Sequence, residues 1–178
     1  ASYLRLADRR TFALASYTVD SQDFARALGP ISQWVYLGVL GRWCRARSSS
    51  PAQALRFAPD QWRQMELGAL IHPPISRLLG DPGQCAALST GDESRMLQQA
   101  LSAARHALNW QSERRCSDWN EADLRDLTFR LLKYSGAQNF DQTLSMVETL
   151  AASNGTTSLQ EQLLELDEQM AAQAELLQ

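Results

Sequence analysis

The sequence predicts an all-α fold, an irregular multi-helix bundle of about eight or nine helices that ends in a C-terminal amphipathic helix. Helix-start signals recur along the chain, apolar residues in its second half are spaced by three and four, and strand-like alternation hardly occurs. With 178 residues, 44% of them hydrophobic, the chain is long enough for one core. We therefore expect a single domain, with a helical body over 1–135 and an acidic helical segment over 136–178 packed on it.

Short helices are expected in the first half, because several dipeptides there combine a capping side chain with proline. Ser50-Pro51 and Asp81-Pro82 each place a side-chain oxygen at the N-cap and proline at the first helical position. Pro30 opens a run over 31–44, and Pro59 opens another over 60–71. These signals predict helices that are short and numerous.

The run over 31–44 is apolar on nearly every side of a helix, so we expect a helix buried centrally in the body. Gly38 and Gly41 inside it each cost a helix about 1 kcal/mol relative to Ala. Close approach by a neighbouring helix would explain both glycines, and an irregular break in the helix would explain them equally well.

Longer amphipathic helices are expected in the second half. One over 92–110 is capped by Ser89 or Thr90, and Asn120 caps the next. A third begins at Asn139 and ends at Asn154-Gly155. The expected inward-facing residues are Leu97, Ala100, Leu101, Ala104 and Leu108 in the first, Leu124, Leu127, Thr128 and Leu131 in the second, and Phe140, Leu144, Val147 and Ala151 in the third.

The last predicted helix opens with a capping box, because Ser158 is followed three residues later by Glu161. Its apolar residues are spaced 4, 3, 4 and 7, a heptad-like seam that Gln173 interrupts. The seam either packs back on its own domain and completes the core, or binds a helix of a partner protein. The seam residues, of which the first four are candidate partner-binding residues, are Leu159, Leu163, Leu166, Met170 and Leu177.

Charge is distributed unevenly along the chain. Residues 1–133 hold 17 basic and 13 acidic side chains, a net charge of +4, whereas the last 45 residues hold seven carboxylates and no Lys or Arg. The net charge of the whole chain is −3. A basic body joined to an acidic end is typical of a protein that docks onto other proteins.

The densest basic cluster consists of Arg42, Arg45 and Arg47, which are further candidate partner-binding residues. Arginine side chains suit phosphate, so nucleic acid is an alternative partner. Trp43 alone supplies an aromatic ring among these arginines, and the acidity of the whole chain opposes attraction to phosphate. Nucleic acid is therefore disfavoured. Arg45 and Arg47 are also explained by the dipole at the C-terminal end of a buried helix.

Catalytic patterns do not rise above background. His72 precedes Pro73-Pro74 in an expected loop, and His106 lies off the main apolar stripe of its helix. Neither histidine has a carboxylate placed to orient it, and no nucleophile motif or phosphate-binding glycine loop is present. We therefore expect no enzyme, no catalytic residue, no cofactor and no small-molecule substrate.

The cysteines and the hydropathy pattern bear on the compartment. Cys44, Cys85 and Cys116 are widely separated and form no C-x-x-C pair, so neither a disulfide framework nor a metal site is expected. No apolar run approaches the roughly 20 residues needed to cross a bilayer, and residues 1–10 lack the apolar region of a secretory signal. We expect a cytoplasmic protein with no membrane insertion.

Two stretches resemble a known family. The opening Ala1-Ser2-Tyr3-Leu4 and the later Glu93-Ser94-Arg95-Met96-Leu97-Gln98-Gln99-Ala100-Leu101 are similar to patterns in the cytosolic sorting-platform adaptors of bacterial type III secretion injectisomes, the SctK or YscK group. Arg5 stands where the family pattern has histidine, and the acidic end of the chain is a second departure from it. The resemblance covers these two patches.

The resemblance implies an α-helical, non-enzymatic adaptor with two protein-binding faces, placed in the cytoplasm at the periphery of an inner-membrane complex. One face would meet the cytoplasmic domain of the inner-membrane ring, and the other would meet the pod protein. The opposite charges of the body and the acidic end are compatible with this role, because charge complementarity orients docking partners. The runner-up is a helical subunit of a nucleic-acid-binding effector complex, and an enzyme comes last.

Overall fold

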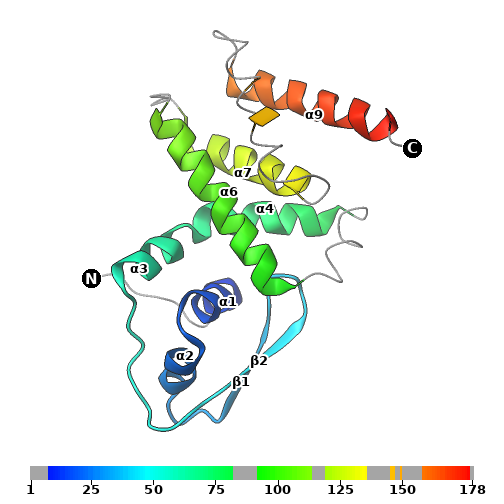
Figure 1. Cartoon of the computed structure of the whole chain (residues 1–178). Helices are drawn as coiled ribbons and strands as arrows, with labels where there is room; N and C mark the ends of the chain where they lie inside the picture. The colour runs from blue at the N-terminus through cyan, green and yellow to red at the C-terminus, as the bar shows by residue number, and fades with distance from the viewer. Residues whose placement is uncertain are drawn as a thin grey trace. The chain divides into compact units, whose positions relative to one another are not determined.

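The computed structural model describes residues 8–81, 92–113, 119–135, 145–146, 149 and 158–176 (Figure 1). The chain divides into two compact units, Ala1–Ser102 and Ala103–Gln178. The described residues form seven helices and one two-stranded sheet. The predicted helical character is therefore confirmed in outline. The predicted number of helices is not confirmed, and the sheet corrects the expectation of helices alone.

Two aspartates start the first two helices. The carboxylate of Asp8 accepts a hydrogen bond from a backbone N–H of α1 (Arg9–Thr18) at 2.8 Å. The carboxylate of Asp20 does the same for α2 (Ser21–Ala27), also at 2.8 Å. Each bond satisfies an N–H group that has no acceptor within its own helix, so the short linker between α1 and α2 is well defined.

The run over 31–44 lies mainly in a β-hairpin, and the predicted central helix is wrong. Strand β1 (Gln33–Leu37) pairs antiparallel with β2 (Trp43–Arg47). Gly41 adopts φ +74° in the turn, a conformation that glycine takes at little cost, so the chain reverses there. Side chains along β2 alternate between exposed and half-buried. The apolar residues of this run, which would cover every side of a helix, are instead divided between the two faces of the hairpin.

The hairpin lies beside α1 and α2 (Figure 1), and aromatic rings pack its inner face against them. Phe12 of α1 is 2% exposed. Its ring centroid lies 5.1 Å from those of Phe24 and Trp34 and 4.7 Å from that of Tyr36. Aromatic pairs at such distances contribute about 0.5–1.5 kcal/mol each beyond the burial of their area. This cluster fixes the position of the hairpin within the first unit.

The predicted helix start at Pro59 is confirmed, because α3 (Pro59–Glu66) begins there. The predicted start at Ser50-Pro51 is wrong, since no helix covers residues 51–58. Backbone hydrogen bonds explain the difference: the N–H groups of Ser49 and Gln53 donate to carbonyls at the end of α2, each at 3.1 Å. These bonds hold the chain beside α2 in place of a helical turn.

The next helix, α4 (Gly68–Gly80), continues through Pro73 and Pro74, so His72 lies in a helix and not in the predicted loop. The prolines remove two N–H donors from the helix, and burial of its apolar face offsets that cost. Asp81 follows the helix as its C-cap, and the predicted helix after Asp81-Pro82 falls outside the described residues. The buried face consists of Leu70, Ile71, Pro74, Ile75 and Leu78.

The long amphipathic helix predicted over 92–110 is α6 (Glu93–Glu113), which runs from the first unit into the second. Asp92 accepts a hydrogen bond from Ser94 N at 3.0 Å, whereas the predicted caps Ser89 and Thr90 lie outside the described residues. The predicted stripe is buried at Leu97, Ala100, Leu101 and Ala104 and half-buried at Leu108.

The second unit contains α7 (Glu121–Ser135) and α9 (Leu159–Leu176), and both start as predicted. Asn120 Oδ1 accepts hydrogen bonds from two backbone N–H groups, at 2.7 and 3.2 Å. Ser158 and Glu161 form the expected reciprocal capping box. The predicted inward face of α7 is buried at Leu124, Leu127, Thr128 and Leu131.

Other parts of the second half are less fully described. The helix predicted from Asn139 falls on residues of which the structure describes only 145–146 and 149. Among the helices that the structure does describe, none combines the length and the apolar character that crossing a membrane requires.

Candidate functional site

The predicted arginine cluster lies on the hairpin. Arg45 and Arg47 are on β2, and Arg42 is in the turn that precedes it. Because side chains alternate along a strand, Arg45 and Arg47 share the outer face of the sheet with Trp43 and Val35. Trp43 is 77% exposed and Val35 is 54% exposed. The hairpin therefore presents an outward surface that is both cationic and apolar.

The charges of two of these arginines are unpaired. Arg45 and Arg47 are exposed and form no ion pair with any residue that the structure describes. Elsewhere in the first unit, Arg26 lies 3.5 Å from Asp23, and Arg63 is paired with Asp60. The outer face of the hairpin thus holds positive charge that an external acidic group can neutralise.

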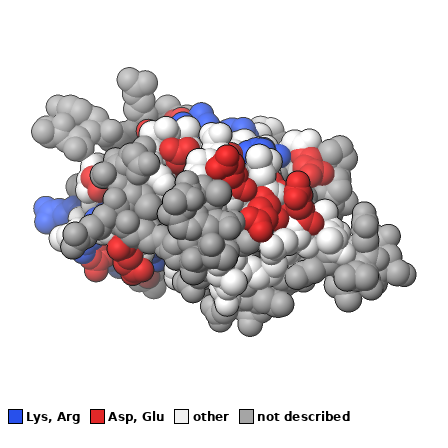
Figure 2. Space-filling model, turned by 90° about the horizontal axis from the view of Figure 1, so that it is seen from above, with Lys and Arg blue, Asp and Glu red and all other residues white. Residues whose placement is uncertain are grey.

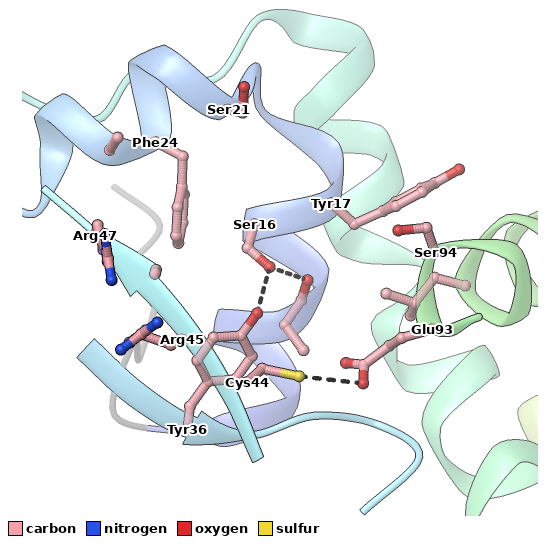
Figure 3. A pocket seen from close by; sticks show the side chains of 14 residues that line it. Ser16, Tyr17, Ser21, Phe24, Tyr36, Cys44, Arg45, Arg47, Glu93 and Ser94 are labelled. Atoms are coloured by element: carbon pink, nitrogen blue, oxygen red, sulfur yellow. Dashed lines mark hydrogen bonds between the residues drawn. The ribbon is translucent and has the colours of Figure 1, made fainter. Parts of the chain in front are cut away.

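A groove of about 400 Å³ runs along one side of the hairpin, between β2, α1, α2 and the start of α6 (Figure 3). Four consecutive residues of β2, 44–47, line it, whereas β1 contributes the single residue Tyr36. The groove therefore follows the edge of β2 that faces away from β1. Phe24 and Leu97 give it an apolar portion, and Ser16, Ser21 and Ser94 give it hydroxyl groups.

The register of the hairpin shows which backbone groups face the groove. The N–H of Gly38 donates to the carbonyl of Arg42 at 2.8 Å, and the N–H of Ser48 donates to that of Ser32 at 3.1 Å. Hydrogen-bonded pairs alternate along an antiparallel ladder, so the even-numbered residues of β2 bond to β1. The N–H and carbonyl groups of its odd-numbered residues, 43, 45 and 47, point to the opposite edge.

Half-buried polar contacts lie at the inner end of the groove. Glu93 accepts a hydrogen bond from Val39 N at 2.9 Å and one from the Cys44 thiol at 3.5 Å. The hydroxyl groups of Ser16 and Tyr36 lie 3.3 Å apart. Figure 3 shows the Ser16–Tyr36 and Cys44–Glu93 contacts as dashed lines. Glu93 at the start of α6 therefore ties that helix to the hairpin turn.

Two ionisable groups of this cluster are held in their neutral forms. Burial, together with the nearby Glu93 carboxylate, raises the pKa of the Cys44 thiol above its ordinary value. Burial likewise raises the pKa of the Tyr36 hydroxyl. A thiolate is the reactive form of cysteine, and a raised pKa makes it scarce at neutral pH. The cluster is thus better suited to holding the turn than to nucleophilic chemistry.

The predicted seam residues lie in the second unit, where α9 packs against α7. Leu163, Leu166 and Met170 are buried, and the side chain of Leu159 is outside the described part of the chain. In this arrangement the three buried side chains fill the α7–α9 contact. Their role in partner binding stays a prediction, which would require α9 to separate from α7.

An ion-pair network fastens α9 to α7. The Arg130 guanidinium lies 3.0 Å from Asp167 and 3.3 Å from Asp126, and its side chain is 8% exposed. The Tyr134 hydroxyl also donates to Asp167. Burial and this hydrogen bond raise the pKa of the Tyr134 hydroxyl. Glu161 and Glu168 are exposed on α9. Figure 2 shows acidic side chains gathered on one face of the molecule.

The residues weighed for catalysis or metal binding do not converge within the described structure. His72 is in α4, where burial lowers its pKa to about 4, and His106 is exposed on α6. Cys85 and Cys116 fall outside the described residues. Across residues 8–81, 92–113, 119–135 and 158–176, no group of three or more His, Cys, Asp or Glu side chains could hold a metal ion.

Sequence reasoning identified the arginines but missed the groove and Glu93. Gly38 and Gly41 were the signal that could have revealed the hairpin, because two glycines between apolar runs are compatible with a hairpin turn. Comparison of the chain with protein-family models, with curated proteins and with solved structures finds no match.

Proposed function

We propose that this chain is a non-enzymatic helical adaptor in a protein assembly and that the hairpin is one of its docking surfaces. The observation that carries the proposal is the outer face of the hairpin, where exposed Trp43 and Val35 lie beside Arg45 and Arg47. Tryptophan and arginine are enriched among the residues that dominate binding energy at protein interfaces. A partner would cover the apolar side chains and neutralise the arginines.

The distribution of charge supports two docking surfaces with different partners. The first unit holds 11 basic and eight acidic residues, a net charge of +3. The second holds six basic and 12 acidic residues, a net charge of −6. Opposite charges favour different partners and suppress wrong pairings. We infer that the first unit receives an acidic partner and the second a basic one.

The chemistry of the half-buried groups Cys44 and His72 favours a role without catalysis. Cys44 is protonated at neutral pH and donates its hydrogen to Glu93, so it is a weak nucleophile. His72 is half-buried in α4, and its pKa of about 4 makes it a poor proton carrier near neutrality. Cys44 lines the groove beside the hairpin, whereas His72 does not.

We further propose that the assembly is a bacterial type III secretion injectisome. The second of the two resembling patches, which begins at Glu93, forms the start of α6, and Glu93, Ser94 and Leu97 from it line the groove. In that setting the chain would act in the cytoplasm and link the cytoplasmic domain of the inner-membrane ring to the sorting platform. The first patch, 1–4, lies outside the described residues.

Affinity purification of the tagged chain from its native cell, followed by mass spectrometry, tests the adaptor role. We expect a protein complex that survives nuclease treatment and that is lost from the variant R45E/R47E. The matched control R9E/R56E makes the same change of charge at two exposed sites of the first unit outside the hairpin, where neither arginine forms an ion pair with the described residues. If R45E/R47E recovers as much of the partner as the control variant does, Arg45 and Arg47 are not part of the interface.

A nucleic-acid-binding subunit is the second candidate, and the exposed ring of Trp43 beside Arg45 favours it. Aromatic rings stack on unpaired bases and arginine pairs with phosphate, a combination common at single-stranded sites. This candidate predicts bound RNA or DNA in the purified material. It also predicts affinity that falls steeply between about 50 and 200 mM salt. Loss of all partners on nuclease treatment would favour it over the adaptor.

A further inference from the structure

We propose that an extended segment of a partner protein adds to the free edge of β2 as a third strand, and that this segment alternates acidic and apolar residues. The proposal rests on the adaptor role and specifies the chemistry of the partner. It combines three observations: an unpaired strand edge, a groove that runs along that edge, and two arginines without ion pairs beside it.

The unpaired edge supplies the main-chain contacts. Trp43, Arg45 and Arg47 each turn an N–H and a carbonyl group away from β1. None of these groups has a hydrogen-bond partner among the described residues. A row of unpaired donors and acceptors is the template on which an extended peptide forms a new ladder.

Neighbouring contacts set the length of the site. At one end the N–H of Ser49 already donates to the carbonyl of Ala25 in α2. At the other end the chain turns at Arg42, beyond Trp43. The open edge therefore spans 43–47, which is roughly 15 Å of strand at about 3.3 Å per residue. A partner segment of about five to seven residues matches this length.

Side-chain alternation gives the sequence of the incoming strand. Residues that point to the outer face would lie beside Arg45 and Arg47, where opposite charges on neighbouring strands stabilise a pair. The intervening residues would point into the groove, toward Phe24 and Leu97. Its volume of about 400 Å³ is enough for a few medium-sized apolar side chains. Acidic residues outward and apolar residues inward satisfy both surfaces.

The same edge discriminates between a peptide and a nucleic acid. Arg45 offers a carbonyl oxygen as well as an N–H group on this edge. A peptide strand satisfies both, because it carries donors and acceptors in turn. A phosphate backbone accepts hydrogen bonds and cannot satisfy the carbonyls. The groove therefore favours a protein segment.

Synthetic peptides and the full chain provide the test. The probe is a fluorescently labelled heptapeptide that alternates Glu and Val, read by anisotropy, and a heptapeptide with four Glu followed by three Val is matched in charge. Two further peptides carry N-methyl groups on the Glu amides alone or on the Val amides alone. One set of amides faces β2 and the other faces away, so we expect one methylated peptide to lose at least about tenfold in affinity and the other to bind like the parent.

Variants of Arg45 separate charge from main-chain pairing. R45A keeps the N–H group and should weaken binding by about threefold to tenfold. R45P removes an N–H that does not bond to β1, and it should weaken binding by a further factor of about ten. If R45P does not fold, as judged by circular dichroism, the methylated peptides on the parent chain decide the question.

Several outcomes would overturn strand addition. They are equal binding of the alternating and block peptides, equal behaviour of the two methylated peptides, and absence of binding by every peptide. Preferential binding of a heptanucleotide would overturn it in favour of nucleic acid. Recovery of a protein partner that R45E/R47E loses, combined with failure of the peptides, would leave the adaptor role in place and reject the third strand alone.

Discussion

Glu93 connects two elements that are far apart in the sequence, and Gly38 makes that connection possible. A Cβ atom at Gly38 would lie 2.0 Å from Glu93 Oε2, which no real structure tolerates. The carboxylate is the mobile end of a long side chain, so it would move away. It would then lose its hydrogen bonds to Val39 N and Cys44. The glycine is thus required for the contact rather than for its backbone conformation.

The first prediction follows from this dependence. Gly38→Ala should lower the free energy of unfolding by about 1–2 kcal/mol, the usual worth of such hydrogen bonds. In the Glu93→Ala background, where nothing is left to displace, the same change should cost less than about 0.5 kcal/mol. Urea unfolding of the four chains in this double-mutant cycle measures the coupling.

Gly41→Ala is the matched control for that cycle. Gly41 has φ +74° and no neighbouring atom within 4 Å of a built Cβ, so alanine there is strained independently of Glu93. Its cost of about 1 kcal/mol should be the same with and without Glu93. Additive behaviour of Gly38 and Glu93 would show that the carboxylate contact contributes nothing to the turn.

His72 gives the second prediction, on acid sensitivity. Burial lowers its pKa from 6.5 to about 4, with a further contribution from Arg10, while Asp8 acts in the opposite direction. Below pH 6.5 the unfolded chain binds a proton that the folded chain excludes. Stability is therefore complete above pH 6.5 and is lost as the pH falls toward 4. The loss between pH 7.5 and pH 5 should be about 2 kcal/mol.

Thermal unfolding at several pH values checks this sign. His72→Gln removes the titrating group, so the variant should lose less stability on acidification than the parent. His106→Gln, at an exposed site on α6, controls for the removal of a histidine as such. A parent and a His72→Gln variant with identical pH profiles would exclude His72 as the source of the acid sensitivity.

The sequence predicted the arginines of the candidate site but not the contacts of Glu93. Arg45 and Arg47 were identified because charge clusters are visible in a linear chain. Glu93 was named as the first residue of the patch that resembles the adaptor family, and no contact with the hairpin was expected of it. Its contact with Val39 depends on how the hairpin folds back over α6. Neither spacing nor composition encodes that approach.

At the scale of elements, the hairpin and α6 show where periodicity succeeds and fails. Over α6 the apolar spacing holds for many turns, so the helix is unambiguous. The run over 31–44 is short and almost wholly apolar, and such a run reads equally as a buried helix or as two strands. Gly41 favours the hairpin over a helix because it allows a turn. The aromatic cluster around Phe12 stabilises the hairpin by packing against its inner face.

The third prediction concerns the contact between α7 and α9. Arg130 is 8% exposed and shares its charge between Asp167 and Asp126. Asp167→Ala would leave this buried charge with one weaker partner, and we expect a loss of about 2–3 kcal/mol. Hydrogen exchange should report the loss first in the amides of α9, because the contact holds that helix in place.

Glu168→Ala is the control for this change. Glu168 is the next residue on α9, is exposed, and forms no ion pair with the described residues. Its removal alters the net charge equally and should change stability by less than about 0.5 kcal/mol. Equal effects of the two substitutions would mean that the Arg130 network does not fasten α9.

At the scale of the whole molecule, charge and compactness divide the chain at different places. The sequence changes from basic to acidic after Lys133, whereas the first compact unit ends at Ser102. The acidic residues of α7 and α9 therefore share one unit with Arg130 and Lys133, which they partly neutralise. Glu161 and Glu168 of α9 are exposed, so part of the acidity predicted from the sequence lies on the surface of the second unit.

The fourth prediction is that deletion of residues 158–178 unfolds the second unit selectively. Leu163, Leu166 and Met170 are 2%, 1% and 7% exposed, and burial of such side chains contributes about 1.5–3 kcal/mol each. Their combined loss, about 5 kcal/mol or more, equals the whole stability of many domains. The helical signal in circular dichroism should therefore fall by more than the contribution of the deleted helix alone.

Hydrogen exchange shows which helices unfold in the deletion variant and distinguishes unfolding of the second unit from unfolding of the whole chain. Amides of α7 should exchange rapidly in the deletion variant, whereas those of α1 and the hairpin should keep their protection, because Phe12 and its aromatic neighbours lie entirely within the first unit. Protection of α7 that survives the deletion would mean that α9 is an appendage, free to bind a partner through its seam. Leu164→Ala, at a 59% exposed site between two buried leucines, is the control and should leave both units intact.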